Sequence, residues 1–151
     1  MPRSGAHAHR LFVAAGLLCV AIAAPAFSQP NRAAPANITG AWSFQTQAYG
    51  DGCRMFGKMT IRPDANGRHI CTFSTEEHCP DIVAKAQESC TAQRSDGALS
   101  IKSTVLSVSP KVGYDPDDFD LKIDNSSYMT GTMKSFHSAP VEFFRGDAPN
   151  S

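Results

Sequence analysis

The chain has 151 residues, with 14 Lys and Arg against 14 Asp and Glu and a pI near 6.9. Its length is that of one domain. A formal net charge of zero excludes a basic protein that binds nucleic acid through the phosphates, and it also excludes an acidic disordered chain. Composition therefore says more about architecture than about activity.

The first 28 residues are organised like a secretory signal peptide. Two arginines and no acid precede an apolar run at residues 11–24, and the small residues Ala26 and Ser28 follow before Gln29. That order of basic, apolar and small residues is typical of a cleaved export signal. The apolar run has 14 residues, short of the roughly 20 that span a bilayer, so a membrane anchor is the less favoured interpretation. We expect a periplasmic or secreted protein with no membrane attachment after signal cleavage.

Removal of residues 1–28 changes the composition of what remains. About 123 residues are left, of which about 37% are hydrophobic, with a net charge near −2. Residues 29–37 are Pro, Ala and Asn with little apolar bulk, which predicts a flexible tail; residues 38–145 form the expected domain, and 146–151 are a polar C-terminal tail. Only three leucines lie in the domain, and this favours strands over helices.

Alternation of apolar and polar residues predicts the first four strands. The pair Asn66-Gly67 is typical of a hairpin turn, because both residues tolerate positive φ. Residues 75–84 are ambiguous, since Pro80 could begin a short helix through Lys85 or the segment could be a long loop. The predicted strands cover residues 41–45, 55–62, 69–73 and 86–94.

Four further strands follow. In the fifth strand the apolar positions shift parity after Val105, to Leu106 and Val108, which predicts a bulge or bend. Residues 109–118 are rich in turn-forming residues. The predicted strands cover residues 99–108, 119–123, 129–133 and 140–145.

Eight short strands in sequence predict an all-β fold. The simplest closure is an eight-stranded antiparallel up-and-down barrel, which leaves no unpaired edge; a β-sandwich is the alternative. The second face of the strands carries Lys58, Arg62 and Lys122. An outer-membrane barrel needs an apolar band on that face, so the pattern favours a barrel surrounded by water.

Four cysteines remain after signal cleavage, and an even number in an exported chain predicts two disulfides with three possible pairings. A hairpin centred on Ala65 places Cys53 opposite residue 77, close to Cys79. Pairing of the third and fourth strands can bring Cys71 near Cys90. We therefore predict Cys53–Cys79 and Cys71–Cys90. Two histidines stand beside cysteines, but no Cys-x-x-Cys occurs, so we expect no metal site.

The start of the first strand, Gly40-Ala41-Trp42, resembles the Gly-x-Trp opening of calycin-like barrels. That group includes lipocalins, avidins and small periplasmic protease inhibitors. The resemblance implies a barrel with a binding role, in which the tryptophan closes one end. Without the resemblance, Trp42 is interpreted as a core aromatic residue.

The candidate functional residues are apolar. An eight-stranded barrel is just wide enough to be filled by side chains or to hold one small ligand. Inward-facing positions supply the candidate barrel lining, namely Trp42, Phe44, Met59, Phe73, Leu99, Ile101, Met129 and Met133.

Catalytic and cofactor patterns are not found. The acidic run at residues 114–120 does not match a calcium loop, because Phe119 and Asp120 occupy the positions of a ligand and of the required glycine; we interpret it as a turn. The chain contains neither Gly-x-Ser-x-Gly nor His-Glu-x-x-His. We therefore expect no enzyme, no cofactor and no catalytic residues.

These observations predict a non-enzymatic exported binding protein whose target is unknown. One alternative is an inhibitor of a periplasmic or secreted hydrolase that inserts residues 29–37 into the partner's cleft. The other is a carrier of a small apolar ligand in the barrel. The expected partner is thus a small apolar ligand or a protein, and not nucleic acid.

Overall fold

A computed structural model describes residues 36–135 and 137–147 of the chain. The predicted signal peptide, all but the last two residues of the predicted tail at 29–37, and residues 148–151 lie outside the described residues. Within the described part no helix forms, so none of it is a helix long and apolar enough to cross a membrane.

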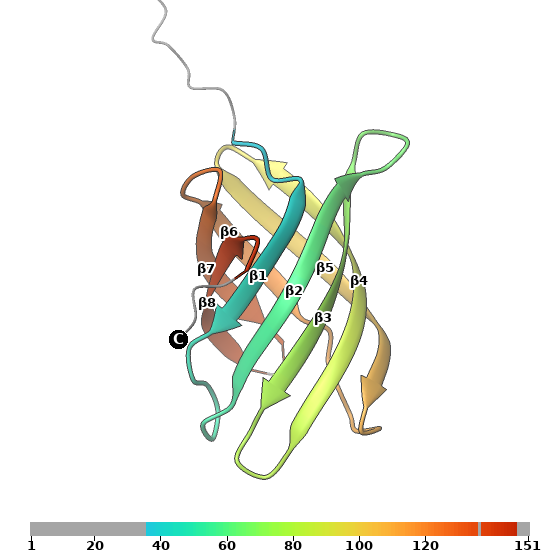
Figure 1. The fold of residues 1–151 in the computed structure, drawn as a ribbon, viewed down its shortest axis with the longest axis vertical. Coiled ribbons are helices and arrows are strands. Elements are labelled where there is room, and N and C mark those ends of the chain that lie inside the picture. The colour runs from blue at the N-terminus through green and yellow to red at the C-terminus, as the bar shows by residue number, and fades with distance from the viewer. Residues whose placement is uncertain (1–35, 136, 148–151) are drawn as a thin grey trace, which may run out of the picture. The chain divides into compact units, whose positions relative to one another are not determined.

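Eight antiparallel strands close into a barrel in which each strand pairs with the next and β1 pairs with β8 (Figure 1). This confirms the predicted up-and-down barrel over the sandwich. The strands are β1 (Gly40–Thr46), β2 (Arg54–Pro63), β3 (His69–His78), β4 (Val83–Ser95), β5 (Ala98–Ser109), β6 (Asp118–Ile123), β7 (Tyr128–Lys134) and β8 (Ser138–Arg145).

The hairpin between β2 and β3 forms at the predicted turn. The Asp64 side chain accepts hydrogen bonds from the backbone N–H groups of Asn66 and Arg68 at 2.8 and 2.9 Å, and Gly67 has a φ of 76°. An aspartate that bonds the backbone two residues on is a common turn device. The register pairs Arg54 with His78, which centres the turn on Asn66, one residue after the predicted centre at Ala65.

That register explains the first disulfide and the next hairpin explains the second. Cys53 and Cys79 are each one residue beyond a paired position, and they are bonded with their Cα atoms 4.1 Å apart. Cys71 and Cys90 are direct partners in the β3–β4 register, with Cα atoms 4.8 Å apart. Both predicted pairings are confirmed.

The segment at residues 75–84 is neither the short helix nor the long loop that its sequence left open. β3 continues to His78 and β4 begins at Val83, so only a tight turn joins them. Glu76 and Lys85 pair across the two strands and form a salt bridge at 2.7 Å. Cross-strand pairing and the adjacent disulfide therefore outweigh the helix-starting tendency of Pro80.

The predicted bulge in β5 is present. Gln87 pairs with Ser107 and Glu88 with Val105, which leaves Leu106 without a partner on β4. Because of the extra residue, Val108 takes an inward-facing position opposite Ala86. Leu106 faces outward, with 63% of its surface exposed. The parity shift in the sequence is thus the local signature of this bulge.

Aromatic side chains fill the middle of the barrel. Phe44 lies within 4.8–6.0 Å, between ring centroids, of Phe73, Phe119 and Phe143. Gly57 makes room for this cluster, because a Cβ atom there would lie 2.2 Å from the Phe44 ring. Each buried phenylalanine contributes about 1.5–3 kcal/mol, so the cluster is a large part of the stabilisation of the domain.

Trp42 lies toward the end of the barrel where β1 begins. Its indole N–H donates to the carbonyl of Ile38 at 2.8 Å, and the guanidinium of Arg145 stacks 4.4 Å from its ring centroid. Arg145 also donates to the carbonyl of Thr39 at 2.8 Å. The tryptophan is thereby held between the chain that enters β1 and the last residue of β8.

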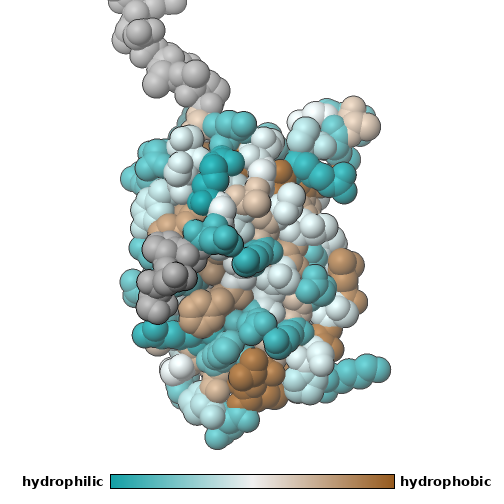
Figure 2. Space-filling view, viewed as in Figure 1, coloured by the Kyte–Doolittle hydropathy of each residue, from teal (hydrophilic) through white to brown (hydrophobic). Residues whose placement is uncertain are grey.

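Exposed apolar side chains gather toward the opposite end. Figure 2 shows apolar residues at the surface near the β3–β4 turn. Among the described residues, the large hydrophobic side chains that are exposed lie in the connections at that end or in strand segments close to them; they are Phe56, Ile82, Val83, Leu106 and Val112.

Candidate ligand site at one end of the barrel

The up-and-down topology brings four connections together at the lower end in Figure 1. Their described residues are 47–53, 79–82, 110–117, 135 and 137, and we call this end the mouth. A pocket of about 440 Å³ opens there. Its walls come from three of the connections and from the end of β3, and consist of Tyr49, Glu77, Gly113, Tyr114, Asp115, Asp117, Ser135 and His137.

One wall of the pocket is a tyrosine–carboxylate pair. The Tyr49 hydroxyl donates to Oε1 of Glu77 at 2.6 Å. Tyr49 is held by backbone hydrogen bonds with Cys53, and Cys53 is bonded to Cys79 just beyond the end of β3. Burial, followed by the neighbouring Glu77, raises the pKa of Tyr49. The phenol therefore stays protonated and keeps donating to the carboxylate.

A second tyrosine–carboxylate pair turns the long connection inward. The Tyr114 hydroxyl donates to Oδ2 of Asp117 at 2.8 Å and lies 3.1 Å from Oγ1 of Thr75 on β3. Burial raises the pKa of Tyr114, and the charge of Asp117 adds to the effect. Because the phenol gives its only hydrogen to Asp117, the Thr75 hydroxyl donates to the phenol oxygen. Residues 110–117 are thus tied across the mouth to the inner face of β3.

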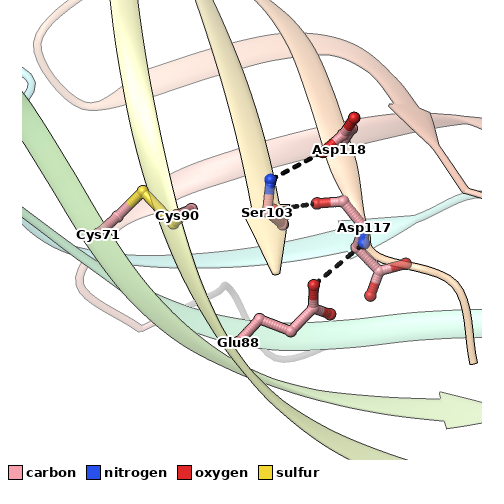
Figure 3. Close-up of a disulfide and its surroundings, with 6 residues drawn as sticks. All are labelled: Cys71, Glu88, Cys90, Ser103, Asp117 and Asp118. Carbon is pink, nitrogen blue, oxygen red and sulfur yellow. Dashed lines mark hydrogen bonds between the residues drawn. A yellow bond between two sulfur atoms is a disulfide. The ribbon is translucent and has the colours of Figure 1, made fainter. Parts of the chain in front are cut away.

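Two carboxyl groups are buried behind this wall. Glu88 on β4 is 1% exposed and Asp117 is 0% exposed. Oε2 of Glu88 accepts the backbone N–H of Asp117 at 3.1 Å, and the Ser103 hydroxyl donates to the Asp117 carbonyl at 2.6 Å (Figure 3). The neighbouring Asp118 accepts the Ser103 backbone N–H at 2.8 Å and faces outward to Lys102.

Burial dominates the acid–base properties of this pair. It raises the pKa of Glu88 to about 9, and the nearby charge of Asp117 adds to the effect. Burial also raises the pKa of Asp117, to about 6, against the hydrogen bonds that it accepts. At neutral pH the pair therefore holds one proton, since two adjacent carboxylates do not both ionise in an apolar setting. The two side chains share a hydrogen bond, in which the protonated carboxyl group of Glu88 donates to the carboxylate of Asp117.

The pocket residues and the sequence-predicted lining residues do not overlap. The structure places all eight predicted residues in the core, where none is more than 3% exposed. The predicted turn at residues 114–120 contributes Tyr114, Asp115 and Asp117 to the pocket, and Glu88 is not among the residues predicted for a site. One signal was available: Glu88 has the same strand parity as Ala86 and Cys90, which puts a carboxyl group on an inward face.

One group of residues has the composition of a metal site. Ligand atoms of Cys53, Glu77 and Cys79 lie within 4.8 Å of one another. The two sulfurs are bonded to each other, so neither offers the thiolate that a metal requires. No other group of three such ligands lies this close together in the described part of the chain.

Comparisons with known proteins address the fold only. No protein-family model and no curated protein matches the chain. Among solved structures, a de novo designed fluorescence-activating β-barrel is similar, with a TM-score of 0.49 and 16% sequence identity over 72% of this chain and 93% of the designed chain. The calycin-like resemblance stays a prediction.

Proposed function

We propose that this chain is an exported, non-enzymatic binding protein that holds a small molecule in the mouth pocket. The observation that carries the proposal is the pocket itself, with about 440 Å³ of space and hydroxyl, carboxyl and imidazole groups converging from four chain segments. That volume is in the ordinary range for small-ligand sites. The calycin-like opening at residues 40–42 agrees with a binding role.

The architecture supports a site at the mouth rather than inside the barrel. The middle of the barrel is occupied by the phenylalanine cluster, which argues against the apolar carrier suggested by the sequence. The mouth connections stand on a closed sheet and are tied by the Cys53–Cys79 disulfide and by the hydrogen bonds of Tyr49 and Tyr114. Loops on a rigid scaffold are a common location for ligand sites.

Burial of the two acids supports binding over catalysis. General acid–base work requires a group within hydrogen-bond reach of the substrate. The Glu88 and Asp117 side chains are almost fully buried, so a molecule in the open pocket meets the tyrosines before it meets either carboxyl group. Their role in the proposal is to hold residues 110–117 in place.

Export is part of the proposal and rests on two independent features. Residues 1–28 have the order of a signal peptide, and the two disulfides are compatible with an oxidising compartment such as the periplasm or the extracellular space. The expected location is therefore periplasmic or secreted.

A variant that fills the pocket tests the binding site. Gly113 lines the pocket and a Cβ atom there meets nothing within 4 Å, so Gly113→Phe is the variant chosen to fill the pocket with a ring. Ala65→Phe adds the same ring to an exposed turn at the opposite end. Both variants and the wild type are expressed as the full chain, purified after export, and screened by NMR against a panel of small cationic, neutral and anionic metabolites.

The expected result is a ligand that shifts the resonances of Tyr114 and Ser135 in the wild type and in Ala65→Phe but not in Gly113→Phe. If no member of the panel perturbs the mouth residues, or if Gly113→Phe binds as the wild type does, the proposal is wrong. Retention of the full-length amino terminus after expression in a bacterium, read by mass spectrometry, contradicts the export part.

A further inference from the structure

We infer that the edge of β5 nearest the mouth is a pairing surface for a second copy of this chain, which lays its own β5 antiparallel along it. The edge consists of residues 104–109, and we call it the β5 edge. The inference goes beyond the proposed binding function and does not involve the mouth pocket. It follows from the short pairing between β5 and β6, from the exposure of the side chains along the β5 edge, and from its lack of charge.

β5 has a strand partner on both sides only along its first part. On one side β4 pairs along it as far as Ser109. On the other side β6 pairs only with residues 98–101, and Ser103, just beyond them, is held by Asp117 and Asp118 instead (Figure 3). No strand in the described part of the chain pairs with the β5 edge on this second side. Barrel closure, which is predicted to leave no unpaired edge, therefore leaves this short one open.

The connection that follows β5 turns into the barrel instead of running beside the open edge. The Tyr114 hydroxyl lies 3.1 Å from Oγ1 of Thr75 on the inner face of β3. The Asp117 backbone N–H donates to Glu88 on β4 at 3.1 Å. These contacts draw residues 110–117 across the mouth. Among the described residues, no backbone hydrogen bond joins this connection to the β5 edge.

Side-chain exposure along β5 marks the same boundary. Where β6 is present, the inward-facing Leu99 and Ile101 are 1% and 0% exposed. Val105 and Val108 also face inward, opposite buried residues of β4, yet they are only partly buried. On the outer face Leu106 is 63% exposed. A strand laid along the β5 edge therefore covers apolar surface that the barrel itself leaves in water.

The β5 edge lacks the residues that usually prevent strands from pairing between molecules. Such protection comes from charged side chains, from prolines and from bulges. Residues 104–109 are Thr-Val-Leu-Ser-Val-Ser, with neither charge nor proline. The bulge at Leu106 bends the strand and so limits pairing to a short length. The β-branched residues of the segment favour the extended conformation that a pairing strand needs.

The β5 edge is complementary to itself. Two copies related by a two-fold axis present the same strand to each other in antiparallel orientation, and two-fold dimers are the commonest protein oligomers. With Leu106 opposite Leu106, Thr104 faces Val108, and the exposed leucines of the two copies meet. Each copy uses its one open stretch of β5 in this contact, so the assembly stops at a dimer.

Charge favours this second copy over a foreign peptide. In the same register Lys102 faces Pro110, so no lysine opposes a lysine, and Lys102 keeps its salt bridge with Asp118 at 2.8 Å. Like charges directly opposite each other destabilise a strand pair, and this arrangement avoids them. The β5 edge itself carries no charged group that selects a foreign sequence. It offers backbone groups and apolar side chains, and a second copy matches both.

Introduction of charge at one position tests the two-fold pairing. Leu106→Lys and Leu106→Glu each place like charges opposite one another in a dimer of that variant, whereas a mixed dimer has opposite charges there. Phe56→Lys is the matched control, because Phe56 is also an exposed apolar residue, with 37% of its surface exposed, but lies where β2 is paired on both sides. The wild type and the three variants are expressed as the full chain and purified after export.

Analytical ultracentrifugation is expected to show a weak wild-type dimer, with a Kd on the order of 100 μM, because one short strand pair is a small contact. Each Leu106 variant alone should weaken dimerisation at least about tenfold, and an equimolar mixture of the two should restore it to within about threefold of the wild type. Phe56→Lys should change it by less than about twofold. Amides of residues 104–109 should exchange hydrogen more slowly in a concentrated than in a dilute wild-type sample.

Three results overturn the inference: a wild type that stays monomeric up to about 1 mM, equal losses of dimer from Leu106→Lys and Phe56→Lys, or no recovery of the dimer when the two Leu106 variants are mixed. A foreign peptide that slows amide exchange at residues 104–109 of an otherwise monomeric protein assigns the β5 edge to another partner and rejects pairing between copies. None of these outcomes bears on ligand binding at the mouth.

Discussion

Replacement of Glu88 by glutamine isolates the contribution of the buried carboxyl pair to stability. Glu88 is 1% exposed, and burial raises its pKa from 4.5 to about 9. The folded protein therefore keeps a proton that the unfolded chain releases above pH 4.5. The contribution of Glu88 to the free energy of unfolding is fully present below pH 4.5. It falls as the pH rises toward the folded-state pKa near 9.

The magnitude follows from the width of that window. Stability falls by about 1.4 kcal/mol per pH unit, which amounts to roughly 3 kcal/mol between pH 4.5 and pH 7. Glutamine does not ionise, its oxygen can accept the Asp117 backbone N–H as Oε2 does now, and its amide can donate in place of the carboxyl hydrogen. We expect Glu88→Gln to be more stable than the wild type at pH 8 by about 4 kcal/mol, and within about 1 kcal/mol of it at pH 5.

Urea unfolding at pH 5, 7 and 8, followed by the fluorescence of the single tryptophan, Trp42, measures this difference. Glu76→Gln is the control, because Glu76 is exposed and its hydrogen bond from Lys85 lowers its pKa. Because its pKa is lowered in the folded protein, the Glu76 carboxylate contributes stability at high pH. Removing it in Glu76→Gln therefore does not increase the stability at pH 8. Parallel pH curves for the wild type and Glu88→Gln, or a less stable Glu88→Gln at pH 8, refute the reasoning.

Three further predictions concern packing and the surface. Replacing Cys71 and Cys90 together by alanine should lower the free energy of unfolding by about 2–4 kcal/mol, measured by urea unfolding; a difference below about 0.5 kcal/mol contradicts the bracing role. Gly57→Ala should be less stable by about 1–3 kcal/mol because its Cβ meets a phenylalanine ring at 2.2 Å, whereas Gly113→Ala, with nothing within 4 Å, should unfold at the wild-type temperature. Leu106→Lys should change stability by no more than about 0.5 kcal/mol and reduce association at high concentration, measured by analytical ultracentrifugation; unchanged association shows that this 63% exposed side chain is not a contact.

Local sequence patterns were sufficient to predict much of the fold, because the alternation of apolar and polar residues along a strand indicates which side chains face the core. Alternation at Met55, Met59 and Ile61 predicted an inward face, and all three are 1% exposed. The Asn66-Gly67 turn located the centre of the first long hairpin to within one residue, which was accurate enough for the Cys53–Cys79 disulfide. The Cys71–Cys90 disulfide followed separately from pairing of the third and fourth strands. The parity shift after Val105 located the bulge.

Prediction failed where a segment's structure depends on a distant partner. Residues 75–84 contain Pro80 and no clear alternation, and their strand conformation comes from pairing within a hairpin that the disulfide at Cys79 closes. The sequence does not indicate whether inward-facing side chains fill the barrel. The outcome depends on how residues from β1, β3, β6 and β8 pack together, as the phenylalanine cluster shows.

Alternation, turn residues and cysteine spacing are properties of short stretches of chain, and they were enough to predict eight strands and two disulfides. The location of the mouth pocket, in contrast, follows from tertiary contacts. Glu88 and Asp117 are 29 positions apart and their backbone contact exists only after residues 110–117 fold back over β4. Tyr49 likewise meets Glu77, 28 positions away, through its backbone hydrogen bonds with Cys53 and the Cys53–Cys79 disulfide beyond the end of β3. The pocket is built from such long-range contacts, and no local pattern encodes them.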